Sequence, residues 1–342
     1  MSISDFAITR LKLKKGCLLS IVITLVICLA VPLVMFCAYW FHHIHVPKRH
    51  IKKAVEITDR ASVNVISVGD EGGSDFLSPH EYRAGETSSC KVVSLPELVI
   101  RLCVIPPKRN WVHLEIMDKK TGKTTELDVD IGGYALGEGD VDVTYSGDSI
   151  FAVWRNEKQG VYSINLTVIH RAGGKERVTR KVYEKGFGIH HISAGYSEQS
   201  KALLIAWNDW SYPSDEDLFL GRLDADQINR SAFTNSQILK EDRWDKAGPY
   251  FLVDGPDLYL AHSTGHHMGF FAHEGTVSIG VSKIGASLKP EAYRMIASVD
   301  VLPKILKIEN GIVYYTRQDA ELSKIVEVRK ISFDEAYHPF GR

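Results

Sequence analysis

The chain has 342 residues, of which 44% are hydrophobic and 24% are charged, and its formal net charge is −1 at pH 7. This composition is typical of a folded protein and provides enough chain to bury a large core. The near-neutral charge argues against a nucleic-acid partner, because such a partner selects for a basic surface.

An apolar run near the N-terminus predicts a membrane anchor. Cys17 to Phe41 is almost uncharged, and about 25 residues of helix are long enough to cross a hydrocarbon core of roughly 30 Å. A cleaved signal peptide is the alternative, but its apolar region is normally about 7–15 residues and ends at a small-x-small site. No such site follows this run, so we expect an uncleaved signal anchor and a membrane partner for residues 17–41.

The charges around this run predict its orientation. Arg10, Lys12, Lys14 and Lys15 precede it directly, and positive charge favours the cytoplasmic side. The N-terminus is therefore expected in the cytoplasm and the C-terminal domain outside it, in the periplasm if the source is bacterial. The expected domains are a cytoplasmic tail (1–16), the anchor (17–41), a linker (42–61), a folded β domain (62–334) and a C-terminal tail (335–342).

Two cysteines outside the apolar run predict a disulfide bond. The segments Ser89 to Leu95 and Leu98 to Ile105 are expected to form a hairpin, in which a two-residue loop pairs residues whose numbers sum to 193. Cys90 and Cys103 meet this condition, and directly opposed strand positions are close to the spacing that a disulfide requires. The alternative is a pair of buried thiols in a reducing compartment.

A repeat organises the rest of the chain. Four apolar strand cores end at positions 154, 207, 262 and 315, which are 53, 55 and 53 residues apart, and Leu98 to Arg101 falls 53 residues before the first. Five units of about 50 residues, each with several strands, are typical of a β-propeller. We therefore predict an all-β, five-bladed propeller; a β-sandwich, six blades or two smaller β domains are the alternatives. In the second unit the expected strands are Val141 to Ser146, Ile150 to Trp154, Tyr162 to His170 and Arg177 to Tyr183.

The last unit contains only three expected strands. An open edge would be left there, but Ser62 to Val68 alternates in polarity and precedes the first unit. We predict that this strand completes the last blade beside Ile325 to Ile331 and so covers the exposed edge.

One end of the expected propeller collects polar and aromatic residues. The loops between second and third strands, and those between blades, emerge at this end. Rigid aromatic surface with polar tips suits a sugar or a protein partner. Trp154 and Trp207 have a second interpretation, which is that they fill the space between blades. The candidate ligand residues are Arg155, His190, His191, Asp209, Trp210, Trp244, His266 and Arg317.

The histidines at this end do not form a metal-ligand motif. His262, His266, His267 and His273 are close in sequence, but their spacing fits no established zinc pattern. We expect them to be exposed loop residues, and we predict neither a metal nor a cofactor.

Two repeats carry a resemblance to a known family. His191 to Tyr196 followed by Leu203 to Trp207, and Ala247 to Leu252 followed by Asp257 to His262, resemble blades of sialidase-like and arabinanase-like propellers. The resemblance covers roughly residues 85 to 335 and implies the fold.

The same resemblance implies catalytic carboxylates on the innermost strands, one of them a glutamate before a Gly-Pro or Ala-Pro step. Lys246 and Ala247 precede Gly248-Pro249 here, so the implied glutamate is missing, and the sialidase Asp-box is absent. Asp142, Asp209 and Asp245 are the remaining weak catalytic candidates.

Two functions follow from these patterns. The first is a membrane-tethered, non-catalytic module that binds a protein or a glycan, of which a bacterial immunity or envelope-assembly factor is one example. The second is a glycoside hydrolase, which requires two carboxylates roughly 5–9.5 Å apart. The missing glutamate favours the binding module.

Overall fold

We analysed a computed structural model of the chain. The structure describes residues 20, 23–38, 40, 41, 49, 52–54, 57, 62–67, 89–95, 97–104, 111–130, 140–147, 149–170, 177–185, 188–211, 215–226, 228, 233, 235–238, 245–265, 277–285, 287, 290, 291, 293–298, 304–316 and 325–339.

The chain divides into two compact units, Met1–Arg49 and His50–Arg342. In the first unit, residues 23–38 are helical and their side chains are exposed. Among the described residues, we find no helix that has both the length and the apolar character needed to cross a membrane. The run from Cys17 to Phe41 lies partly outside the described residues, so the anchor stays a prediction.

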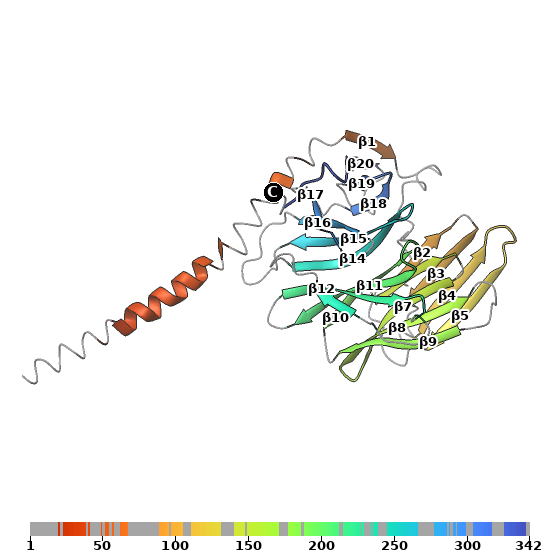
Figure 1. Cartoon of the computed structure of the whole chain (residues 1–342), viewed down its shortest axis with the longest axis horizontal. Helices are drawn as coiled ribbons and strands as arrows, with labels where there is room; N and C mark the ends of the chain where they lie inside the picture. Colours follow the sequence, from red (N-terminus) through yellow and green to blue (C-terminus); the bar gives the residue numbers. More distant parts are fainter. Residues whose placement is uncertain are drawn as a thin grey trace, which may run out of the picture. The chain divides into compact units, whose positions relative to one another are not determined.

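The second unit is all-β. Within the described residues, strands β1 to β20 form five four-stranded antiparallel sheets (Figure 1). We number the sheets 1 to 5 along the chain. Sheet 1 contains β2 (Ser89–Ser94), β3 (Leu98–Val104), β4 (Trp111–Asp118) and β5 (Thr124–Asp130). Sheet 2 contains β6 (Val141–Ser146), β7 (Ser149–Lys158), β8 (Val161–His170) and β9 (Arg177–Lys185).

The remaining sheets continue the same order. Sheet 3 contains β10 (Ile189–Ser197), β11 (Ala202–Ser211), β12 (Asp215–Asp224) and β13 (Asn235–Ile238). Sheet 4 contains β14 (Asp245–Asp254), β15 (Asp257–Gly265), β16 (Val277–Ile284) and β17 (Arg294–Ser298). Sheet 5 contains β18 (Lys304–Glu309), β19 (Ile312–Thr316), β20 (Ile325–Ser332) and β1 (Ser62–Ser67).

This order confirms the predicted five-bladed β-propeller. The first strands of successive sheets contact one another in sequence, from β2 through β6, β10 and β14 to β18. Strand bounds in sheet 2 agree with those expected from the turns, and β7 continues four residues beyond Trp154.

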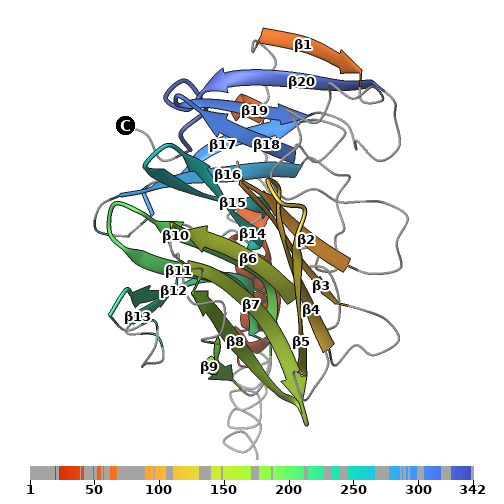
Figure 2. The same cartoon turned by 90° about the vertical axis from the view of Figure 1, so that its right-hand side faces the viewer.

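The last sheet is completed by the N-terminal strand, as predicted. β1 pairs antiparallel with β20, from Ser62 opposite Lys330 to Ser67 opposite Ile325. Figure 2 shows β1 along the outer edge of β20. The pairing covers an edge that would otherwise expose unpaired backbone groups.

Apolar side chains fill the space between consecutive sheets. Separate clusters join sheet 1 to sheet 2, sheet 2 to sheet 3, sheet 3 to sheet 4 and sheet 4 to sheet 5. The approach is close between sheets 3 and 4, where a Cβ added to Gly195 would lie 2.6 Å from the ring of Phe251. Only glycine therefore fits at this position without displacing the ring.

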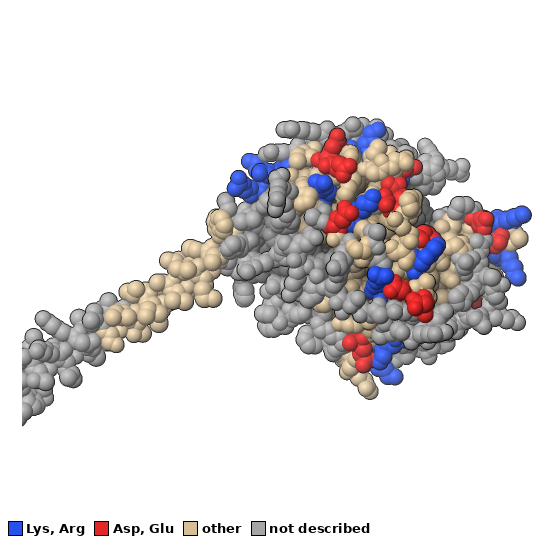
Figure 3. All heavy atoms as spheres, in the orientation of Figure 1, with Lys and Arg blue, Asp and Glu red and all other residues tan. Residues whose placement is uncertain are grey.

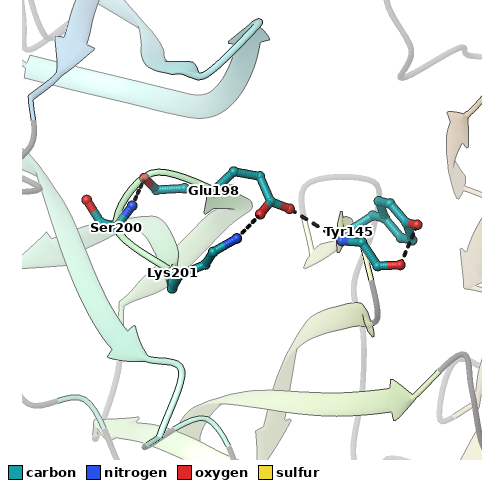
Figure 4. A network of polar contacts seen from close by, with 6 residues as sticks. Tyr145, Glu198, Ser200 and Lys201 are labelled. Atoms are coloured by element: carbon teal, nitrogen blue, oxygen red, sulfur yellow. Dashed lines mark hydrogen bonds and ion pairs between the residues drawn. The ribbon is translucent and has the colours of Figure 1, made fainter.

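Turns between first and second strands are bonded from sheet to sheet. In the network of Figure 4, Glu198 in the turn of sheet 3 accepts a hydrogen bond from the Gly147 amide in the turn of sheet 2, at 3.3 Å. The ammonium of Lys201 lies 2.7 Å from the same carboxylate. Asp254 likewise accepts bonds from the amides of Asn310 and Gly311, which links sheets 4 and 5.

The chain segments that precede β1 and follow β20 also pack on the sheets. Ala54 is fully buried beside Tyr293 and Met295, and Tyr337 pairs with Met295 through a backbone hydrogen bond of 2.7 Å. These contacts involve residues that the sequence assigns to the linker and to the C-terminal tail.

The hairpin of β2 and β3 has the predicted register. Cys90 lies opposite Cys103, and Cys103 is disulfide-bonded and buried. We predict that its partner is Cys90. The closed loop is short, so the bond should stabilise the fold by about 3 kcal/mol in the chain-entropy description. Alkylation of the native protein without reductant, followed by mass spectrometry, should leave both thiols unlabelled. Labelling of both would rule out the bond.

Removal of the closing strand should destabilise the whole unit. Deleting Ser62–Ser67 from the full chain uncovers β20, and we expect a loss on the order of 3 kcal/mol, or roughly 6–12 °C in Tm for a domain of this size. Thermal unfolding followed by circular dichroism measures this change. The matched control replaces the exposed Lys52 and Lys53 by Ala, and should leave Tm nearly unchanged. Equal Tm values for the deletion and the control would contradict closure by β1.

Candidate functional site

The end of the propeller with the predicted ligand residues is built by strand ends of neighbouring sheets. In sheet 2 the second strand ends and the third begins at the tight turn between β7 and β8, with Gln159 and Gly160 at positive φ. In sheet 3 the first strand begins at Ile189. The described side chains at this end come chiefly from these two sheets.

The two tryptophans at the ends of the strand cores belong to the core. Trp154 and Trp207 are almost fully buried in the layers between sheets. The Trp207 ring stacks on Phe219 and Phe233, with centroid separations of 5.6 and 5.4 Å. Their role is therefore the space-filling one, which was the second interpretation of the sequence.

Arg155 links sheets 2 and 3 and is not on the exposed ligand surface, contrary to the prediction. Its side chain is 2% exposed, and its Nε lies 2.6 Å from Oδ1 of Asp140. Its Nη1 donates to the carbonyl of Ile189 at 2.6 Å, and its Nη2 donates to Asp140 at 2.9 Å. A buried guanidinium needs such partners because desolvation of an unpaired charge is costly.

Asp142 also holds two sheets together. It is 2% exposed and its Oδ2 accepts bonds from Ser193 Oγ at 2.6 Å and from the Ala194 amide at 2.8 Å. Its Oδ1 accepts from the Val143 amide at 2.9 Å. Ser193 Oγ in turn accepts a bond from the Phe251 amide at 3.2 Å. Asp142 therefore bonds sheet 2 to sheet 3, and Ser193 extends the chain of bonds to sheet 4.

A similar bond, which the sequence did not suggest, joins sheets 3 and 4. Asn208 directly follows Trp207, as Arg155 follows Trp154, and its Oδ1 accepts from the Gly248 amide at 2.8 Å. Gly248 has φ of 58° at a bulge in β14. The sequence does contain one signal for this contact, because Asn208 occupies the position directly after the tryptophan that Arg155 occupies in the preceding repeat.

Tyr162 and His190 contact one another at this end, and His191 directly follows His190 in the chain. Tyr162 and His190 are partly exposed, with ring centroids 6.3 Å apart, and the Arg155 guanidinium lies 5.3 Å from the Tyr162 centroid. Burial, followed by the neighbouring Glu157 carboxylate, raises the pKa of Tyr162, and even at its ordinary pKa a tyrosine phenol is protonated at neutral pH. His191 is exposed and has φ of 40° at a bulge in β10. Such a backbone is uncommon for a residue other than glycine.

The other predicted site residues fall into two groups. Asp209 and Trp210 lie near the end of β11, Asp245 is the first residue of β14, and their side chains are not described. Trp244, His266 and Arg317 lie outside the described residues. His262 is buried, and its ring packs edge-on against Tyr293 at 5.4 Å, so it does not belong to an exposed loop.

No group of three or more metal-ligating side chains is assembled within the part of the chain that the structure describes. Acidic and basic side chains are interleaved on the face shown in Figure 3. Charge of one sign is not gathered over the described residues of that face.

Solved structures provide three comparisons. The endo-arabinase from Bacteroides thetaiotaomicron has 12% identity and a TM-score of 0.42, and the match covers 75% of this chain and 96% of that one. The GH43 endo-arabinanase from Bacillus licheniformis has 10% identity and a TM-score of 0.39, with 71% and 92% covered. A hypothetical protein from Leishmania major has 10% identity and a TM-score of 0.41, with 85% and 95% covered.

Two of these three structures are arabinanases, the class of propeller that the sequence resembles. A scan against protein-family models found no match. A search of curated proteins also found none. The class of this protein, a five-bladed β-propeller, rests on the order and register of its strands.

The buried ion pair gives a direct test of the structural role of Arg155. Replacing Asp140 by Ala leaves the guanidinium buried and unpaired, and we expect the free energy of unfolding to fall by about 3–5 kcal/mol. Replacing both residues, as Asp140→Ala with Arg155→Met, should recover most of this loss. Chemical denaturation measures both values, and Glu184→Ala, which removes an exposed carboxylate paired with Lys181, is the matched control. A single variant as stable as the control would contradict the role.

Proposed function

We propose that this protein is a membrane-tethered β-propeller that binds an extracytoplasmic protein or glycan without catalysis. The ligand surface is the end that carries Tyr162, His190 and His191. One observation supports this proposal most: the described carboxylates on the first strand of sheet 2 and just before it, Asp140 and Asp142, are buried and bonded within the fold.

A catalytic carboxylate must reach the substrate or a water molecule beside it. Both oxygens of Asp142 accept hydrogen bonds from sheets 2 and 3, and Asp140 faces the Arg155 guanidinium. Breaking either arrangement to free the carboxylate would cost an interaction between sheets. These two residues therefore serve the framework of the site.

The side chains that remain at this end suit recognition. Tyr162 combines an aromatic face with a protonated hydroxyl, and the two histidines add hydrogen-bonding groups. Aromatic residues with polar tips are common in contacts with sugars and with protein partners.

Tethering is the second part of the proposal. The apolar run Cys17 to Phe41 is long enough to span a bilayer, and the described side chains of helix 23–38 are exposed, including Leu29 and Met35. A disulfide at Cys103 supports an oxidising compartment for the second unit. The alkylation experiment described above, when performed on intact cells, also reports this compartment.

Glycoside hydrolysis is a second candidate, and the backbone near Asp209 and Asp245 favours it. Asp209 follows Asn208, which is bonded to Gly248 of β14, and Asp245 lies three residues before Gly248. The two aspartates are therefore at the same end of neighbouring sheets. Two of the compared structures are arabinanases, so arabinan is the polymer with which hydrolysis would be tested first.

Binding and hydrolysis can be separated with the full-length protein in detergent. We expect arabinan and xylan oligosaccharides to remain uncleaved, as measured by release of reducing sugar. Binding of a recognised ligand should weaken about tenfold, or about 1.4 kcal/mol, in His191→Asn. Asparagine tolerates the left-handed backbone at this position, so the variant removes the imidazole with little strain. Glu184→Gln, on the exposed face of β9, is the control.

Each outcome decides between the candidates. Hydrolysis that is lost in Asp209→Asn or Asp245→Asn would establish the enzyme and contradict the non-catalytic proposal. Glycan binding without hydrolysis, weakened only by the His191 change, would support a glycan ligand. If arabinan and xylan oligosaccharides are neither bound nor cleaved, these two glycans are excluded as ligands, and a protein partner is the candidate to test next.

A further inference from the structure

The segment that precedes β1 is helical and docks on the propeller. Residues 49, 52–54 and 57 are helical. Ala54 is fully buried beside Tyr293 and Met295, and Ile57 packs against the apolar cluster between sheets 4 and 5. Residues three positions apart lie on the same face of a helix, so Ala54 and Ile57 belong to one docked face. These residues therefore pack as part of the second unit, although the sequence assigns them to a linker.

A second face of this helical segment is basic. Arg49, Lys52 and Lys53 are all exposed, and their spacing of three and four positions is that of neighbours on one helix face. The chain contains no acidic residue between positions 6 and 55, so nearby residues in the sequence do not balance this charge. The buried and exposed side chains therefore divide as in an amphipathic helix whose polar face is cationic.

The two lysines are close in sequence to the predicted anchor. Positions 42 to 51 separate Phe41 from Lys52, and such a connection reaches at most about 35 Å when fully extended and about 15 Å as a helix. Because Ala54 is buried in the second unit, the docked segment stays within this reach of a bilayer that the anchor spans. Positive charge on the outer side of a span works against the predicted topology, so topology does not account for these lysines.

From this arrangement we infer that Lys52 and Lys53, together with Arg49, bind the phosphate groups of an anionic lipid surface. The inference rests on the proposed tether, which brings the membrane within reach. Basic residues beside a span are attracted to anionic lipids. A helix that inserts into a membrane surface buries its apolar face there, but Ala54 and Ile57 already pack on the propeller. The contact with lipid is therefore one of charge alone and is sensitive to salt.

This contact also selects the part of the propeller that faces the lipid. Ala54 packs with Met295 of β17, which is an edge strand of sheet 4. The Met295 amide donates to the Tyr337 carbonyl at 2.7 Å, so the C-terminal segment lies at the same edge. Binding of the two lysines to headgroups holds this edge of sheet 4 toward the membrane.

Hydrogen exchange of the full-length protein in lipid nanodiscs tests this inference. One set of discs contains phosphatidylcholine alone, and the other also contains phosphatidylglycerol. In the anionic discs, the amides of residues 52–57 should exchange about fivefold more slowly for each bound lysine. About 1 M NaCl should remove the difference, because the screening length is then about 3 Å. The amides of β11, which packs in an apolar layer, are the internal reference and should exchange equally in both discs.

Substitution of the lysines identifies the groups that bind. Lys52→Ala with Lys53→Ala should abolish the dependence on anionic lipid, and the fold should be retained because both side chains are exposed. Lys52→Arg with Lys53→Arg preserves the charge and should preserve the effect. Lys119→Ala with Lys120→Ala, an exposed pair in the turn between β4 and β5, is the matched control and should also preserve it. An equal loss in the control pair would contradict binding at Lys52 and Lys53.

The remaining results separate the lipid contact from the tether. Incorporation into both kinds of disc with identical exchange would overturn the lipid contact and leave the tether standing. Failure to incorporate into either disc would overturn the tether and the lipid contact together. Inorganic phosphate added to the phosphatidylcholine discs distinguishes a soluble anion from a lipid surface. Protection by phosphate equal to that in the anionic discs would assign the lysines to a soluble anion and contradict the inference.

Discussion

Apolar packing between consecutive sheets is the constraint on which the rest of this structure depends. A single four-stranded sheet with two apolar faces cannot remain stable in water, so each sheet must cover its neighbour. The layer between sheets 2 and 3, with Trp207 against Phe219 and Phe233, has the packing of a protein core. This requirement places large side chains at the ends of the strand cores, and it leaves them unavailable to a ligand.

Polar groups within these layers must find partners, and the same groups then fix how the sheets meet. Asp142, Ser193 and the Phe251 amide form a series of hydrogen bonds across three sheets. Arg155 bonds sheet 2 to sheet 3, and Asn208 bonds sheet 3 to sheet 4. Because an unsatisfied buried group costs about 1–3 kcal/mol, these bonds favour one relative arrangement of the sheets. The proposed ligand surface at His190 and His191 is therefore built on sheets whose relative arrangement these bonds favour.

The edge of the last sheet imposes a separate requirement. A ring made by a linear chain must join its ends, and here the N-terminal strand completes the last sheet. The pairing of β1 with β20 therefore covers the strand edge that the last sheet would otherwise expose.

The sequence by itself determined the class of fold, because a strand period of about 53 residues and alternating polarity are local patterns that any blade must show. It also determined the register of the hairpin at Cys90 and Cys103, and the strand that closes the last sheet, since turn length and the missing fourth strand leave few alternatives. Only the tertiary structure decided the roles of Arg155 and Asp142. Both side chains are charged and could bind a ligand. They are buried because the fold brings Asp140 and Ile189 beside Arg155, and Ser193 beside Asp142. The hydrogen bonds between sheets join residues 34 to 58 positions apart, and a single sequence contains no local signal for which polar side chains these contacts will bury.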